Sequence, residues 1–263
     1  MTDLIVSRVT QALETLKLRA ASAALERHLQ AARERELSHL QFLDALLADE
    51  TAARQEVSIT VRTKLAHFPS LKSLDSFNFD AQPSLDRRMT NELESLAFVE
   101  RAENVVLLGP PGVGKTHLAI GLGMRALQGG HRVYFVSAQD LLDQIRVAQL
   151  DGIPGHKQRH LVNVPLLIID ELGYVEFDKA AATWLFQLIC QRYERHATII
   201  TSNKAFADWS HIFADTTLAG ALLDRFLHHS HVLSLKGESY RLRAKSRGTA
   251  TLATKPGRQV GPS

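Results

Sequence analysis

The feature that most constrains this chain is a glycine-rich segment that follows an apolar run. Residues 109–116 read Gly-Pro-Pro-Gly-Val-Gly-Lys-Thr, a complete G-x-x-x-x-G-K-[ST] phosphate-binding pattern. Residues 105–108 before it form a short apolar run, typical of a buried parallel strand. Leucine and isoleucine recur among alanines after it, as in a helix. A strand, a loop and a helix in this order favour nucleotide binding over an incidental turn.

The chemistry of such a loop is specific. Backbone N–H groups around Gly112 and Gly114 can wrap an anion, and the following helix points its positive end at the same place. Lys115 should reach the β- and γ-phosphates of ATP, and the Thr116 hydroxyl should ligate Mg²⁺. The predicted nucleotide-binding residues are Gly109, Pro110, Pro111, Gly112, Val113, Gly114, Lys115, Thr116 and His117.

Strand and helix patterns alternate after the loop. Apolar runs at 132–136, 164–169, 197–201 and 232–235 predict four more strands, and the segments 138–150, 179–193 and 218–228 predict helices. This alternation predicts an α/β fold with a five-stranded parallel sheet flanked by helices. The site should lie at the carboxyl ends of the strands.

The chain before the loop has a different character. Residues 1–68 are predicted to be a small, all-helical N-terminal domain, because no glycine or proline precedes Pro69 and leucines recur at helical spacing. Ser38 and Gln41 match a capping box at one helix start. This region is either a bundle that packs on itself or a docking domain for a partner or DNA. Residues 69–247 are predicted to be the nucleotide domain and 248–263 a basic, disordered tail.

Two aromatic residues lie between these domains. Residues 69–83 interrupt the helical pattern and include Phe77 and Phe79, either of which could contact an adenine ring. The alternative is a linker that only packs its aromatic side chains. Residues 84–101 then return to a helical pattern.

Composition limits the class of protein. Hydrophobic residues make up 45% of the 263, enough for a substantial core, and the net charge of +3 does not by itself indicate nucleic-acid binding. The single cysteine, Cys190, excludes a disulfide within the chain and suits a reducing compartment. No signal peptide or membrane-spanning run is recognisable. We therefore expect a cytoplasmic protein without a membrane partner.

Polar residues that follow two of the strands complete a candidate catalytic site. Asp170 should hold Mg²⁺, and Glu171 should act as the general base that activates water. Asn203 follows the next strand, so its amide should reach the same edge, where it can position the water and sense the γ-phosphate. The adjacent acids favour hydrolysis over transfer to a bound acceptor.

Arg225 lies near the end of a predicted helix. It could stabilise the transferring phosphoryl group of a neighbouring subunit, or only form a surface contact with Asp224. In the first case the enzyme would hydrolyse ATP only as an oligomer. The histidines at 228, 229 and 231 have no cysteine or acid at zinc spacing, so we interpret them as a helix end that enters a strand.

Basic residues gather near the C-terminus. Such a cluster can bind DNA phosphates without reading bases, and the predicted DNA-binding residues are Lys236, Arg241, Arg243, Lys245 and Arg247. The tail from residue 248 adds Lys255 and Arg258 and could equally serve solubility.

Several of these stretches together resemble the IstB family, the ATP-binding helpers of two-gene bacterial insertion sequences. The family is related to the helicase loader DnaC within the AAA+ ATPases. The stretches that carry the resemblance are 109–118 (GPPGVGKTHL), 166–174 (LLIIDELGY), 192–195 (RYER), 198–203 (TIITSN), Trp209, 222–229 (LLDRFLHH) and 237–241 (GESYR).

The resemblance implies an AAA+ core with Arg225 as the finger in trans and Arg241 as a sensor near the γ-phosphate. It also implies an oligomer that assembles with ATP on double-stranded DNA, recruits and activates the partner transposase IstA, and hydrolyses ATP to reset. The alternatives are a DnaC-like replicative helicase loader and a P-loop kinase of small molecules. The acids at 170 and 171 and the basic cluster argue against the kinase.

Overall fold

The computed structural model describes residues 2–150, 154–213 and 215–240. The chain divides into two compact units, Met1–Arg62 and Thr63–Ser263. The division falls within one helix, α3 (His39–Leu65). Each unit has a core of its own.

The first unit consists of α1 (Thr2–Thr15), α2 (Arg19–Glu34) and most of α3. Ser38 and Gln41 form the predicted capping box: the Gln41 N–H donates to Ser38 Oγ over 3.3 Å, and the Ser38 N–H donates to Gln41 Oε1 over 2.8 Å. The start of α2 has no side-chain cap of its own. The buried Glu50 of α3 instead accepts hydrogen bonds from the N–H groups of Ala20 and Ala21.

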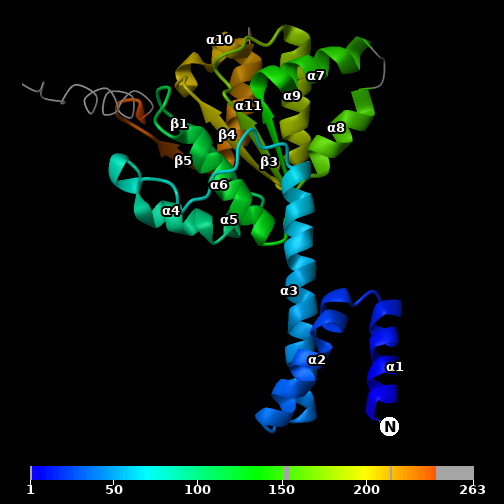
Figure 1. Ribbon diagram of the computed structural model, residues 1–263. Coiled ribbons are helices and arrows are strands. Elements are labelled where there is room, and N and C mark those ends of the chain that lie inside the picture. The colour runs from blue at the N-terminus through cyan, green and yellow to red at the C-terminus, as the bar shows by residue number, and fades with distance from the viewer. Residues whose placement is uncertain (1, 151–153, 214, 241–263) are drawn as a thin grey trace, which may run out of the picture. The chain divides into compact units, whose positions relative to one another are not determined.

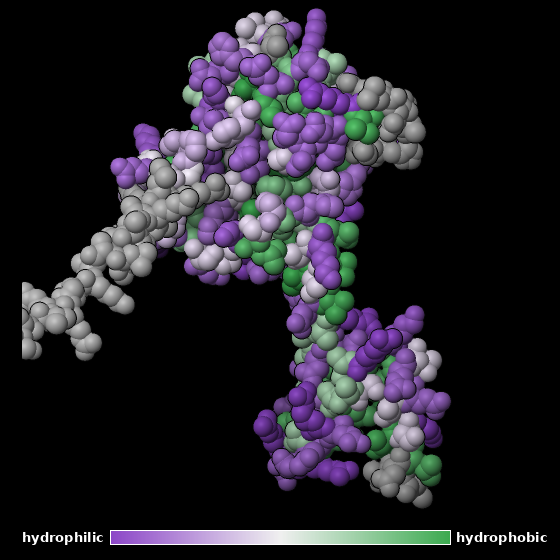
Figure 2. Space-filling view, turned by 45° about the horizontal axis from the view of Figure 1, so that its top comes forward, coloured by the Kyte–Doolittle hydropathy of each residue, from purple (hydrophilic) through white to green (hydrophobic). Residues whose placement is uncertain are grey.

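The core of the first unit is small. It consists of Ala21, Ala24, Leu25 and Leu46, with a few half-buried apolar neighbours. Large apolar side chains remain exposed on the same helices, among them Leu4, Ile5, Leu40 and Leu43. Figure 2 shows such hydrophobic residues among hydrophilic ones on this unit.

The second unit is built around a parallel sheet (Figure 1). Its strands are β1 (Asn104–Leu108), β2 (Val133–Ser137), β3 (Leu166–Asp170), β4 (Ala197–Ser202) and β5 (Ser230–Ser234). The strand order is β2-β3-β4-β1-β5, and every pairing is parallel. The predicted five-stranded parallel sheet with flanking helices is therefore confirmed.

Helices cover both faces of this sheet. Val105 and Leu107 of β1 pack into one core with α4 (Arg87–Glu94), α5 (Ala97–Glu100) and α6 (Lys115–Gln128). Val106, between them, packs into the opposite core. The helices on that side are α7 (Ala138–Leu150), α8 (Pro154–Asn163), α9 (Lys179–Arg192), α10 (Trp209–Phe213) and α11 (Thr216–His228). Because both faces are buried, the central strands are apolar at successive positions.

Three details differ from the sequence expectation. The segment 84–101 forms two helices, because Leu96 has a left-handed φ of +65° that ends the first helical run. The helices α8 and α10 were not predicted, and neither were the short 3₁₀ helices η1 (Phe79–Ala81) and η2 (Phe206–Asp208). Strand β5 begins two residues before the predicted position, since its partly exposed first residues are polar.

A buried arginine joins the core helices to the sheet. Arg192, at the end of α9, is 1% exposed and donates to Thr198 Oγ1 over 2.9 Å. Its remaining donors reach the carbonyl oxygens of residues 161, 162, 164 and 197. Burial lowers the pKa of this guanidinium to about 9. The side chain thus satisfies backbone acceptors at the amino-terminal ends of β3 and β4.

Candidate nucleotide-binding and hydrolysis site

The glycine-rich loop leaves β1 and enters α6 with backbone that only glycine adopts easily. Gly112 has a φ of +81° and Gly114 a φ of +102°. A Cβ at Gly112 would lie 2.1 Å from Ser239 Oγ, and one at Gly114 would lie 2.8 Å from the Phe77 ring. Gly114 is also the cap residue of α6 and provides no side-chain acceptor. The first N–H groups of α6 are thus open to an anionic ligand.

Lys115 lies folded into this loop. Its Nζ donates to the carbonyl oxygens of Gly109 over 2.7 Å and Pro110 over 2.8 Å. Burial lowers the pKa of Lys115, while the charges of Asp170 and Glu171 oppose that shift. The ammonium group is therefore held where the phosphate-binding N–H groups and the acidic strand end meet.

The loop is joined to β3 through Asp170. Thr116 Oγ1 lies 3.0 Å from Asp170 Oδ1 and 2.9 Å from Oδ2, and Thr201 Oγ1 donates to Oδ1 over 2.6 Å. Burial raises the pKa of the Asp170 carboxyl, and the hydrogen bonds from the two threonines oppose this shift. A hydroxyl and a carboxylate that converge at a phosphate-binding loop are a donor set that fits Mg²⁺.

Glu171 turns the chain out of the sheet. It has a left-handed φ of +64°, and its N–H donates to Thr201 Oγ1 over 2.9 Å. Its side chain is exposed and lines the cavity described next. The structure thus brings Lys115, Thr116, Asp170 and Glu171 together at the carboxyl edge of the sheet.

Asn203 lies directly after β4 but does not line that cavity among its described residues. Its Oδ1 is buried and accepts no hydrogen bond from a described residue. A Cβ at Gly173 would lie 2.2 Å from this atom. The Asn203 amide is thus packed against the turn that carries Glu171.

A cavity of 490 Å³ opens beside the loop. Phe77 lines it, whereas Phe79 packs edge-on against Phe77, with 4.8 Å between ring centroids. His117 lines it too and is held by hydrogen bonds with Ser76 Oγ and the Ser73 carbonyl. Of the two aromatic residues proposed for adenine, Phe77 is the one at the cavity.

Sequence reasoning did not foresee two contacts that fix this wall. Gln82 Nε2 donates to the Val113 carbonyl over 2.9 Å, which fixes the loop from outside. The segment after β5 crosses the loop, because the Tyr240 N–H donates to the Gly112 carbonyl over 3.0 Å and Ser239 lies against Gly112. Gln82 belongs to no local motif that would mark this role, whereas Ser239 and Tyr240 belong to the stretch 237–241 that carries the family resemblance.

The basic cluster is only partly placed. Lys236 is exposed, and its N–H donates to Ser84 Oγ over 2.9 Å. The other predicted members lie outside the described residues, as does the tail from 248. They are Arg241, Arg243, Lys245 and Arg247.

Arg225 lies on α11 and does not line the cavity among its described residues. Its guanidinium contacts the Cys190 thiol and lies over the Phe186 ring, 5.2 Å from the centroid. Both of these residues belong to α9. Arg225 is exposed, so another molecule can reach it.

Residues 11–248 match the family model described as IstB-like ATP binding protein. The chain belongs to this family. It is therefore an ATP-binding protein and an ATPase.

Relatives in this family are similar over most of their length. The chain is 49% identical to the ATP-binding protein of insertion sequence IS5376 from Geobacillus stearothermophilus, over 80% of this chain and 83% of the relative. It is 44% identical to the corresponding IS21 protein of Pseudomonas aeruginosa, over 93% of this chain and 92% of the relative.

The solved structure of the DnaC helicase loader shares the fold, with a TM-score of 0.51 at 23% identity. That similarity covers 62% of this chain and 96% of the loader. In the described part of this chain, no helix is both long and apolar enough to cross a membrane.

Proposed function

We propose that this ATPase assembles with ATP on double-stranded DNA, recruits and activates a partner transposase of the IstA type, and hydrolyses ATP to reset the assembly. Membership in the IstB-like family supports this proposal, together with relatives named for insertion sequences. The observation that carries its oligomeric part is that the exposed Arg225 does not line the cavity where Lys115 and Glu171 meet.

Within one subunit, the described residues divide the chemistry among themselves. The N–H groups of the loop and Lys115 would bind the phosphates. Thr116 and Asp170 would hold Mg²⁺, which when bound neutralises charge on the phosphates. Glu171 would accept a proton from the attacking water. Asn203 would position that water or orient the turn that carries Glu171.

The described lining of the 490 Å³ cavity contains no arginine. Phosphoryl transfer in such sites commonly uses an arginine, which contributes ~10³ to 10⁵ in rate. Arg225 is exposed on α11 and does not line this cavity. We therefore place it in the active site of a neighbouring subunit, so that hydrolysis requires the oligomer.

The path from nucleotide to DNA would run through the segment after β5. This segment crosses the loop at Ser239 and Tyr240, and Lys236 is exposed just before the crossing. A phosphate backbone held by Lys236 and the basic residues at 241–247 would thus touch the same segment as the nucleotide loop. DNA binding that depends on ATP follows from this arrangement.

The test uses Glu171→Gln, which should bind ATP and Mg²⁺ without turnover. Its binding to duplex and single-stranded DNA of increasing length is compared by mobility shift at fixed salt, because phosphate-driven affinity depends steeply on salt. Lys115→Ala is the control that should not respond to ATP. Length-dependent assembly on duplex supports the proposal.

Two other outcomes would contradict it. A preference for single strands would favour the helicase loader. Absence of binding to either form would favour a small-molecule kinase.

A further inference from the structure

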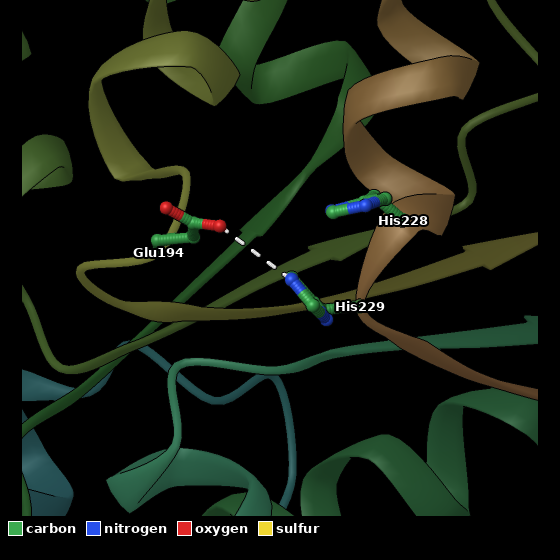
Figure 3. A group of neighbouring side chains, drawn as sticks. All are labelled: Glu194, His228 and His229. Atoms are coloured by element: carbon green, nitrogen blue, oxygen red, sulfur yellow. Dashed lines mark ion pairs between the residues drawn. The ribbon is translucent and has the colours of Figure 1, made fainter.

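We propose that Glu194, His228 and His229 form a site for a divalent transition-metal ion of the Zn²⁺ class. The three residues come from two parts of the chain: Glu194 follows α9, whereas His228 is the last residue of α11 and His229 is its C-cap (Figure 3). The sequence argued against a metal here, because no acid or cysteine lies near the histidines at zinc spacing. The fold supplies the missing carboxylate.

The donor atoms are close enough to share one ion. One ligand atom from each of the three residues lies within 4.8 Å of the other two. His229 Nε2 and Glu194 Oε1 are 3.5 Å apart. Ligand atoms on a tetrahedral zinc, with bonds of about 2.0–2.1 Å, are roughly 3.3–3.5 Å apart. All three side chains are exposed, so the ligand nitrogen of His228 can rotate toward an ion held between Glu194 and His229.

The backbone supports this arrangement on the α9 side. Glu194 has a left-handed φ of +56°, one residue beyond the C-cap Tyr193. Glycine or asparagine is favoured at that position, because a side chain there is strained. The strained turn carries the only carboxylate of the cluster, and Figure 3 shows both imidazoles on the side that faces it.

Tyr193 acts as a positioning residue for the histidines. Its hydroxyl lies 2.7 Å from His228 Nδ1, and its ring stacks on His229 at an interplanar angle of 24°. When Nδ1 carries the proton and donates to the phenol oxygen, Nε2 is left free to bind a metal. Metal-binding histidines characteristically make such a second hydrogen bond.

An ion pair between His229 and Glu194 alone does not explain the cluster as well. The ring centroids of His228 and His229 are only 4.2 Å apart. An ion pair with Glu194 needs only one imidazole, whereas two imidazoles held this close present two nitrogen donors to one cation. The C-terminal end of α11 also favours positive charge. Two imidazoles and one carboxylate are the donors that zinc accepts, with a fourth position left for water.

The site lies at the opposite edge of the sheet from the nucleotide loop. Its residues come just before the first residues of β4 and β5, whereas the loop follows the last residue of β1. A bound ion would tie the end of α9 to the end of α11. Arg225 lies within one turn of His228 and already contacts α9. Metal binding would therefore restrain the helix that presents Arg225; this consequence rests on the proposed role of Arg225, but the metal site does not.

The test is a zinc titration of the full-length protein. Protein stripped with a chelator and free of nucleotide competes for Zn²⁺ with a chromophoric indicator. Wild type should bind one equivalent of Zn²⁺ more tightly than any further zinc. Glu194→Gln and His229→Ala should each weaken the affinity for this first equivalent by ~10- to 100-fold. Tyr193→Phe should give a smaller loss. Zinc should also raise the melting temperature of wild type more than that of Glu194→Gln.

Two controls keep the result specific. His211→Ala removes an exposed imidazole from α10 and should bind zinc like wild type. Asp170→Asn removes the proposed Mg²⁺ ligand and should also retain the equivalent. The proposal is overturned if the Glu194 and His229 variants bind zinc like wild type, or if either control loses as much affinity as they do.

Discussion

Thr116 Oγ1 lies within 3.0 Å of both carboxylate oxygens of Asp170, so that the phosphate-binding loop and β3 are joined by one buried acid. Asp170 is only 5% exposed. The same carboxylate accepts a hydrogen bond from Thr201 of β4. Three segments thus meet at the proposed Mg²⁺ ligand, which makes this position sensitive in both activity and stability.

We expect Asp170→Asn to lose hydrolysis and gain stability. Loss of a ligand worth several kcal/mol corresponds to a rate reduced by at least ~100-fold. Burial raises the pKa of Asp170 in the folded protein. Between the ordinary pKa of aspartate and this raised pKa, the folded protein therefore binds a proton that the unfolded chain has released. Wild type therefore loses stability as pH rises from about 4 through the raised pKa.

The measurement is thermal unfolding without nucleotide or Mg²⁺ at several pH values. The melting temperature of Asp170→Asn should exceed that of wild type at neutral pH, and the difference should shrink toward pH 4. The opposite result would be a melting temperature of Asp170→Asn that falls further below that of wild type as pH rises from 4 to neutral. It would mean that the hydrogen bonds to the Asp170 carboxylate stabilise the fold by more than its burial costs.

Gly112→Ala should disrupt the loop through two separable causes. The new Cβ would lie 2.1 Å from Ser239 Oγ, and the φ of +81° costs a non-glycine residue about 1–2 kcal/mol. ATP affinity should therefore fall. Adding Ser239→Gly should remove the clash but not the backbone cost, so nucleotide binding by calorimetry should recover only in part. Full recovery would show that the backbone cost is negligible, and no recovery would exclude the contact as a cause.

Arg192→Met should destabilise the fold while leaving the nucleotide site chemically intact. The substitution removes a buried charge but leaves several buried carbonyls without their donor. Removing one side of a buried polar network typically costs ~3–5 kcal/mol. Urea unfolding should show this loss, whereas Lys179→Met, at the exposed start of α9, should change stability little. Equal stabilities would contradict the structural role of Arg192.

The sequence predicted best where local pattern and tertiary environment agree. The strands β1, β3 and β4 are buried on both faces, so each is an apolar run that pattern alone identifies. Edge strand β5 is half exposed and begins with polar residues, so its start was placed too late. Helix α8 has few apolar residues, and no periodicity marked it.

The candidate site was likewise predicted where local motifs mark its residues and missed where only tertiary structure brings them together. Lys115, Thr116, Asp170 and Glu171 belong to continuous motifs, and the parallel sheet brings their strand ends together. Gln82 reaches the loop from a distant segment that no motif marks. Ser239 belongs to the stretch 237–241 that carries the family resemblance, but its contact with Gly112 is revealed only by the three-dimensional fold. The carboxylate beside His228 and His229 was missed for the same reason.

Arg225 does not line the nucleotide cavity of its own subunit, so hydrolysis by two inactive variants tests whether a neighbour supplies it. Arg225→Ala should retain Glu171 but lack the arginine, so its hydrolysis should fall by ~10³-fold or more while nucleotide binding persists. Glu171→Gln should retain the arginine but lack the base. Each variant alone should be inactive, and both should still bind ATP.

The most direct measurement mixes these two proteins. ATP turnover is followed at constant total protein as the ratio of Arg225→Ala to Glu171→Gln is varied. A site shared between subunits predicts that activity appears in the mixture and is maximal near equal amounts, because Glu171→Gln subunits supply the arginine to intact bases. Activity that never exceeds the sum of the separate proteins would contradict an active site completed by Arg225 of a neighbour.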